Sequence, residues 1–142
     1  MSNFSRFMKQ NKVQKQNVFK AVTKSLCDED GKPLQWELQP ISTKMNDSIR
    51  ESCTTEIPVK GKPNQFRMKV DMVAYQARLM CASVVYPDLN DKELQDSYGV
   101  MTPEDLLKEM VDDAGEYTEL MSFVQEISGF TTLQEDIEEV KN

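Results

Sequence analysis

The stretch from Asp71 to Tyr86 has the pattern of a helix that is covered on most sides. Its apolar side chains fall on two neighbouring stripes at helical spacing, and Arg78 is the only charged residue between Met72 and Tyr86. The stretch is shorter than the roughly 18 apolar residues that a membrane span requires. Pro87 disfavours helical backbone at the residue before it, so we expect the helix to end at Tyr86. The pattern therefore predicts a core helix around which the rest of the chain packs.

Start and stop signals predict further short helices after this one. Asn90 is a candidate N-cap, and Gly99 has the position of a residue just after a helix end. Thr102 begins a stronger signal, because this hydroxyl cap is followed directly by Pro103 and by acidic residues in the first turn. We expect Met101 to pack on Leu106 as a hydrophobic staple at this start.

In the last third of the chain, apolar residues again recur at helical spacing. One apolar stripe runs from Leu106 to Val111, and the segment from Asp112 to Gly115 interrupts it. Glu116 to Ser128 is the next expected helix, and Gly129 is its stop. The strongly acidic segment from Thr131 to Asn142 is either a last amphipathic helix or a loosely held tail.

The first half of the chain carries strand patterns. Val18 to Leu26 is rich in β-forming residues, and a turn signal follows from Asp28 to Gly31. Further on, Leu34, Trp36 and Leu38 alternate with polar residues, which predicts a hairpin with these three side chains on its buried face. We expect Trp36 to anchor the core of the sheet rather than to bind a ligand.

A second hairpin is expected after a short helix from Thr43 to Ser52, which Ser42 caps. Its strands are Cys53 to Val59 and Gln65 to Val70, joined by a turn that contains Lys, Gly and Pro. Pro58 places the first strand at an edge of the sheet. Apolar and basic residues alternate along the second strand, so we expect one face to be buried and the other to be in water. The residues of the expected buried face are Phe66, Met68 and Val70.

Together these patterns predict the α+β class, with a small antiparallel β-sheet and hairpins in the N-terminal half packed with a mainly helical C-terminal half. A chain of 142 residues is long enough for one core and too short for two. We therefore expect a basic N-terminal arm over residues 1–16, a single α+β domain over residues 17–130, and an acidic helix or tail over residues 131–142.

The run from Ala82 to Met110 reads ASVVYPDLNDKELQDSYGVMTPEDLLKEM, and three further segments accompany it: Leu38–Ser42, Glu51–Thr54 and Gly115–Phe130. In the order and spacing of many residues, these segments resemble the XkdN-like tail assembly chaperones of Gram-positive phages and prophages. The resemblance covers the chain from Leu34 to Gly129 and is weakest at the two ends. It brings no catalytic motif, so it implies a role in assembly and not a reaction.

Charge is divided unevenly along the chain. Residues 1–69 carry 13 Lys+Arg and 7 Asp+Glu, whereas residues 70–142 carry 4 and 17, within a total net charge of −7. One explanation is that acids collect in the first turns of helices, where they oppose the helix macrodipole. The other is an acidic helical surface that receives a basic or amphipathic partner. The basic arm is short and carries no nucleic-acid-binding motif, so we expect no nucleic-acid partner.

The residues offer no complete catalytic constellation. The absence of histidine removes the commonest general base and the commonest zinc ligand together. Cys27, Cys53 and Cys81 have no CxxC spacing and no signal-peptide pattern before them, so we expect free cytoplasmic thiols. The acids around the turn at residues 88–96 lack the spacing of a calcium-binding loop. We therefore expect no enzyme activity, no cofactor and no metal site.

The chain contains nine methionines, most of which fall in the helical half. For Met72 and Met80 we favour a packing role in the core. Met101, Met110 and Met121 are candidates for an adaptable apolar groove, because thioethers tolerate imperfectly matched partner helices. The partner-binding residues that we expect are Tyr86, Leu89, Leu94, Tyr98, Met101, Leu107, Met110, Tyr117 and Met121.

The family resemblance implies a non-catalytic chaperone in the cytoplasm of the bacterial host that is absent from the mature virion. Its implied partner is the long, helical tape measure protein, with tail tube subunits as a second partner, and self-association is left open. No membrane partner is expected. Two alternatives remain: a structural tail component that is retained in the virion, and a small acidic inhibitor that mimics nucleic acid.

Overall fold

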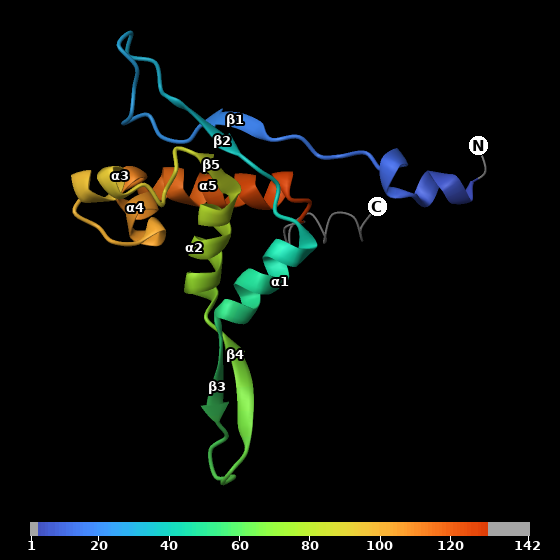
Figure 1. Ribbon diagram of the computed structural model, residues 1–142. Helices are drawn as coiled ribbons and strands as arrows, with labels where there is room; N and C mark the ends of the chain where they lie inside the picture. Colours follow the sequence, from blue (N-terminus) through green and yellow to red (C-terminus); the bar gives the residue numbers. More distant parts are fainter. Residues whose placement is uncertain (1–2, 131–142) are drawn as a thin grey trace, which may run out of the picture.

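Helix α2 (Met72–Ser83) stands at the centre of the fold, as its pattern predicts. The structure, a computed structural model, describes residues 3–130, so the expected acidic helix or tail lies outside the described residues. In Figure 1, α2 descends from the sheet, and it packs on α1 (Thr43–Ser52), α4 (Pro103–Met110) and α5 (Ala114–Ile127). The predicted α+β class is confirmed.

A three-stranded antiparallel sheet lies above α2 and α5 in Figure 1, with its strands in the order β1-β2-β5. Strands β1 (Val18–Ala21) and β2 (Gln35–Leu38) form the first predicted hairpin. In β2 the side chains of Trp36 and Leu38 are almost fully buried, which confirms Trp36 as an anchor of the sheet. Leu34, expected on the same face, is 45% exposed because it lies before the first paired residue of β2.

The predicted end of the core helix is wrong by three residues. The helix ends at Ser83, and Val84–Tyr86 form the short strand β5, which pairs with β2. Two β-branched residues and an aromatic residue, placed directly before Pro87, favour extended backbone. The open edge of β2 supplies the partner for their backbone groups, and the local pattern of the chain contains no information about that edge.

The core lies between the sheet and helices α2, α4 and α5. Met80 belongs to it, as expected. The most deeply buried apolar side chains come from these elements and from Val111 directly after α4: Trp36, Leu38, Met80, Leu106, Leu107, Val111, Leu120 and Val124.

The second hairpin forms where it is predicted, but its expected buried face is wrong. Strands β3 (Thr54–Pro58) and β4 (Phe66–Val70) make a separate two-stranded sheet that projects from the start of α2, away from the body of the protein (Figure 1). No helix covers either face of the projecting part, so Phe66 is 59% exposed and Met68 64% exposed. Met72 is also mostly exposed at the base of this hairpin, which overturns the core role expected for it.

Most of the predicted helix starts and stops are confirmed. The Ser42 side chain accepts a hydrogen bond from the backbone N–H of Met45, and Thr102 caps α4 with Pro103 in its first turn. Gly99 follows the short helix α3 (Lys92–Ser97) with a φ of 68°. This left-handed conformation is available to glycine without the steric cost that a Cβ adds.

Three details of these helix starts differ from the expectation. Helix α5 begins at Ala114 and not at Glu116, because Asp113 caps it and the expected break therefore ends two residues earlier. Helix α3 is capped by Asp91, whose Oδ1 accepts a hydrogen bond from the Leu94 N–H at 3.0 Å, and not by Asn90. The staple between Met101 and Leu106 does not form: Met101 is 90% exposed, whereas Leu106 is buried under the neighbouring helices.

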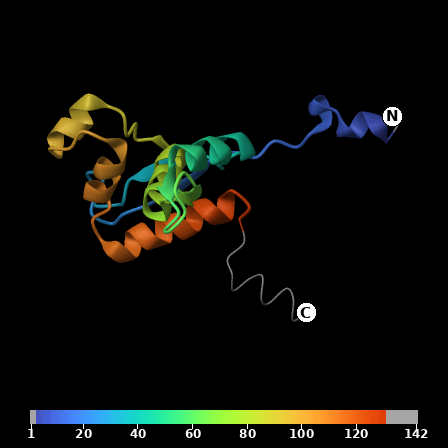
Figure 2. The same cartoon turned by 90° about the horizontal axis from the view of Figure 1, so that it is seen from below.

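The N-terminal arm reaches away from the body of the protein (Figure 2). It contains two short 3₁₀ helices, η1 (Phe4–Phe7) and η2 (Lys9–Asn11), and then an extended stretch that leads to β1. Lys15 Nζ donates a hydrogen bond to the backbone carbonyl of Ile127 at 3.3 Å, which ties the extended stretch to the end of α5.

Candidate protein-binding surface

The structure places the expected partner-binding residues in three different environments. Tyr86 and Met101 are exposed, at 65% and 90% of their surface, so both side chains are available to a partner. Three residues are buried in the core and contribute almost no accessible surface: Leu89, Leu107 and Met110. The other four are half-buried: Leu94, Tyr98, Tyr117 and Met121. The set therefore does not form one surface, and binding by its exposed members stays a prediction.

Two of the expected residues, Tyr86 and Leu94, share a groove between the end of β5 and the start of α3. We call this the acidic groove. It has a volume of about 470 Å³ and is lined by Tyr86, Pro87, Asp88, Asp91, Glu93, Leu94 and Ser97.

Local hydrogen bonds hold the floor of the acidic groove in place. Asp88 Oδ1 accepts a hydrogen bond from the Asn90 N–H at 3.0 Å, which closes the turn after Pro87. Asp91 caps α3, and Gln95 Nε2 donates to the Leu89 carbonyl at 2.8 Å. The side chain of Leu89 is buried in the core, so it also anchors the loop between β5 and α3 to the body of the protein. The groove is therefore formed before any partner arrives.

The chemistry of the acidic groove combines apolar walls with negative charge. Tyr86, Pro87 and Leu94 supply the apolar surface, and three carboxylates surround it. Among the described residues that line the groove there is no Lys or Arg. Such a site favours an apolar or aromatic side chain that is flanked by basic residues.

The carboxylates of the acidic groove were not among the residues expected to bind a partner. In the sequence, Asp88 and Asp91 were considered only as metal ligands with unsuitable spacing, and the uneven charge distribution was the one feature that could have drawn attention to their surface. The exposed residues of the β3–β4 hairpin were also missed, because alternation along β4 indicates a face but not whether another element covers it.

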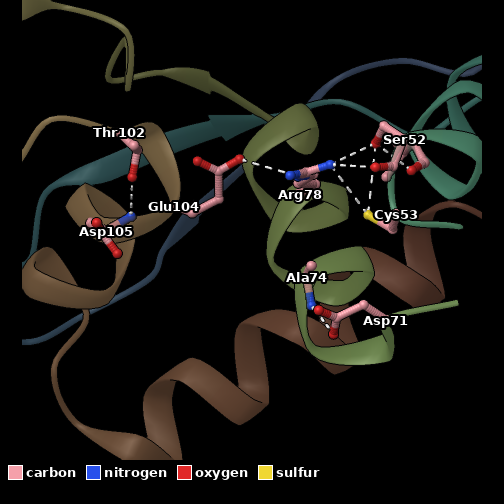
Figure 3. Close-up of polar contacts among 9 residues, drawn as sticks. Ser52, Cys53, Asp71, Ala74, Arg78, Thr102, Glu104 and Asp105 are labelled. Carbon is pink, nitrogen blue, oxygen red and sulfur yellow. Dashed lines mark hydrogen bonds and ion pairs between the residues drawn. The ribbon is translucent and has the colours of Figure 1, made fainter. Parts of the chain in front are cut away.

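Arg78 forms a second polar cluster, which links three helices (Figure 3). Its Nη1 donates to the Ser52 carbonyl at 3.0 Å and to Ser52 Oγ at 2.9 Å, at the C-terminal end of α1. Its Nε lies 3.8 Å from a carboxylate oxygen of Glu104 in the first turn of α4. The cluster holds α1, α2 and α4 together, so its role is structural.

Cys81 on α2 and Tyr117 on α5 are held in their neutral forms. The pKa of the Cys81 thiol is raised to about 12, mainly by burial and then by the negative charge of Glu104, while the positive charge of Lys108 acts in the opposite direction. Burial also raises the pKa of the Tyr117 phenol, with an added contribution from Cys81. Since the thiolate is the nucleophilic form of cysteine, Cys81 is unreactive at neutral pH.

The thiols Cys27, Cys53 and Cys81 are all free. Within residues 3–130, no three Cys, Asp or Glu side chains converge as metal ligands would. In the same part of the chain, no helix combines the length and the apolar character needed to cross a bilayer.

Comparison with a solved structure supports the fold described above. The crystal structure of the protein YqbN matches with a TM-score of 0.76 over 92% of this chain and 99% of that chain, at 24% sequence identity. At this identity the likeness concerns the fold alone.

The sequence comparisons extend over almost the whole chain. The phage-like element PBSX protein XkdN of Bacillus subtilis (strain 168) is 30% identical over 138 residues, which cover 96% of this chain and 91% of that protein. The uncharacterized protein YqbN of the same organism is 29% identical over the same share of each chain. The family model that describes the phage XkdN-like tail assembly chaperone protein matches residues 4–141. This chain therefore belongs to the family of phage XkdN-like tail assembly chaperones.

Proposed function

We propose that this protein is a non-catalytic chaperone that binds the tape measure protein in the cytoplasm of the bacterial host during tail morphogenesis. Its family supports a role in tail assembly. The acidic groove is the observation that carries the choice of binding surface, because a preformed apolar site with three carboxylates suits the basic and apolar residues of an amphipathic helix. Many weak sites along a long partner add avidity.

The arrangement of the acids favours this function over a mimic of nucleic acid. Asp71, Asp91 and Asp113 each accept hydrogen bonds from backbone N–H groups at the start of a helix. Their positions are therefore set by helix capping, and not by the regular spacing of phosphates along a duplex.

Co-expression with overlapping fragments of the tape measure protein tests the proposal. We expect at least one fragment to become more soluble and to co-elute with the wild-type protein. The double variant Tyr86→Ser/Glu93→Lys removes the exposed aromatic wall and reverses one charge of the groove. We expect it to bind the same fragment at least about tenfold more weakly, which corresponds to about 1.4 kcal/mol.

The matched control is Phe19→Ser/Glu109→Lys, which makes the same types of change at exposed positions on β1 and α4. We expect this control to bind like the wild type. The proposed partner is wrong if no fragment co-elutes or gains solubility. Equal binding by the groove variant and its control would instead show that the partner binds elsewhere.

The alternative of a structural tail component makes a different prediction for finished particles. A chaperone leaves before the tail is complete, so mass spectrometry of purified virions should detect tube subunits and no copies of this protein. Its presence at a fixed ratio to the tube subunits would favour the structural role.

A further inference from the structure

The β3–β4 hairpin projects from the body of the protein (Figure 1), and none of its residues from Ile57 to Arg67 is buried. Cross-strand pairing places Pro58 opposite Phe66 and Glu56 opposite Met68, so Phe66 and Met68 lie on one face. Both side chains are mostly exposed. An isolated two-stranded hairpin is marginally stable in water, and contact with another surface would stabilise it.

The same hairpin is strongly basic. Between residues 54 and 70 there are four Lys or Arg residues and one acid, Glu56, which gives a net charge of +3. Lys60 and Lys62 lie in the turn at the tip, and Arg67 and Lys69 lie on the face opposite Phe66. The hairpin therefore presents an exposed aromatic side chain next to a tip that carries Lys60 and Lys62, and this combination suits the acidic groove.

The hairpin does not reach the acidic groove of its own chain. It joins the first residue of α2, whereas the groove begins at β5, which follows the last residue of this helix. The 12 residues of α2 separate the two by about 18 Å. The hairpin also points away from β5 and α3 (Figure 1), so only a second copy brings the two surfaces together.

We propose that the β3–β4 hairpin of one copy docks into the acidic groove of a second copy, with Phe66 against Tyr86 and Leu94. The basic side chains at the tip then face the carboxylates of the groove. Each copy offers one hairpin and one groove, so the contact is heterologous and forms head-to-tail chains or rings. Two hairpins that pair with each other would instead bring two charges of +3 together.

Occupation of the groove by a hairpin has a consequence for partner binding. If the proposed function is correct, the hairpin and the tape measure protein compete for one groove. Self-association then protects the groove until the partner displaces the hairpin. This consequence rests on the proposed function, whereas the self-association itself does not.

Two variants test the contact on the full chain. The hairpin variant is Lys60→Glu/Lys62→Glu/Phe66→Ser, which removes the aromatic side chain and reverses two charges. The groove variant is Tyr86→Ser/Glu93→Lys; it retains Asp88 and Asp91 because they hold the turn and cap α3. The matched control is Phe7→Ser/Lys9→Glu/Lys12→Glu in the exposed N-terminal arm. Circular dichroism establishes that each variant is folded.

Analytical ultracentrifugation at low salt gives a decisive readout. We expect the wild type and the arm control to associate with increasing concentration, and to dissociate at high salt because the contact is charged. Each variant alone should remain monomeric. A mixture of the two should form a 1:1 heterodimer that grows no further, because only one intact hairpin and one intact groove remain.

Several results would overturn the proposal. These are a wild type that stays monomeric at every concentration, a hairpin or groove variant that associates like the wild type, and a mixture that forms no heterodimer.

Addition of a binding tape measure fragment tests the competition separately. Chains that persist with the fragment bound would disprove competition. A monomeric wild type that binds the fragment would disprove self-association and leave the proposed function intact.

Discussion

Trp36 shows how one side chain fixes the position of a strand. It is 2% exposed and lies in β2 between two other strands, where it meets side chains of the helical layer. Its alternation with polar neighbours in the sequence was sufficient to predict this role. The neighbouring strand also carries an aromatic residue, Phe19, but that side chain is mostly exposed.

Trp36→Ala should lower the free energy of unfolding by about 3–5 kcal/mol, because it removes a large buried side chain and leaves a cavity. Urea denaturation followed by circular dichroism measures the change. Phe19→Ala is the control and should cost less than about 1 kcal/mol. Similar losses for both variants would contradict the assignment of Trp36 to the core.

Because of Cys81, we expect the stability of the folded protein to decrease at alkaline pH. The pKa of its thiol is about 12 in the folded state, against an ordinary value of 9.0, so above pH 9 the unfolded chain releases a proton that the folded chain keeps. Stability is therefore complete below about pH 9 and falls as the pH rises toward 12. The raised pKa of Tyr117 acts in the same direction.

We expect the free energy of unfolding to fall by about 1–2 kcal/mol between about pH 8 and about pH 10.5. Cys81→Ala should show a smaller fall over this interval, since its effect on packing is the same at both pH values. Cys27→Ser, at an exposed thiol, should behave like the wild type. An equal fall in the Cys81 variant would show that other groups cause it.

At the scale of elements, the helix starts of the second half were predictable because the signals are local. A Thr followed by Pro and two acids satisfies free N–H groups within one turn, whatever the rest of the chain does. Thr102 Oγ1 indeed accepts a hydrogen bond from the Asp105 N–H at 3.1 Å (Figure 3).

Thr102→Ala should destabilise the protein by about 1 kcal/mol, because it removes the cap of α4. Thr102→Ser keeps the hydroxyl and should recover most of this loss. Thr118→Ala is the matched control on the exposed surface of α5, where the hydroxyl bonds only to the preceding turn. Chemical denaturation of the four proteins measures the difference, and equal stability of the Ala and Ser variants at position 102 would refute the cap.

The Arg78 cluster could not be predicted, because its members lie on α1, α2 and α4, which meet only in the folded chain. Arg78→Met keeps the apolar stem and should cost about 1–2 kcal/mol, since it leaves the last carbonyl of α1 without its charged donor. Glu104→Gln should cost less than about 0.5 kcal/mol, because the ion pair at 3.8 Å is partly exposed. Unfolding curves of both variants measure the two losses of stability. A larger loss for Glu104→Gln than for Arg78→Met would contradict the prediction.

At the scale of the whole molecule, the core and the projecting hairpin are separate features. None of the residues from Ile57 to Arg67 is buried, so the hairpin adds little to the stability of the core. Its exposed aromatic and basic side chains are explained better by contact with another molecule than by folding.

Replacement of residues 57–67 by Asn-Gly should therefore leave a folded protein. The Glu56–Met68 pair remains, and Asn-Gly connects its two strands as a tight two-residue turn. We expect the free energy of unfolding, followed by Trp36 fluorescence, to change by less than about 1 kcal/mol, while concentration-dependent association disappears. A large loss of stability would mean that the hairpin is part of the cooperative fold.

The sequence alone determined the α+β class, both hairpins, the central helix and most helix boundaries. These features depend on periodicity, capping and turn residues, whose physics acts within a few neighbouring positions. The charge pattern showed that the second half of the chain is acidic, and it left open whether these acids cap helices or receive a protein partner. Of the residues expected to bind one, only Tyr86 and Leu94 lie in the acidic groove.

Only the tertiary structure decided which apolar faces are covered. It turned Val84–Tyr86 into a strand, buried Leu107 and Met110, and left Phe66 and Met72 exposed. Burial depends on which elements approach each other from distant parts of the chain. A local pattern therefore shows that a face is apolar, but the packing of the other elements determines whether that face becomes core or remains available to a partner.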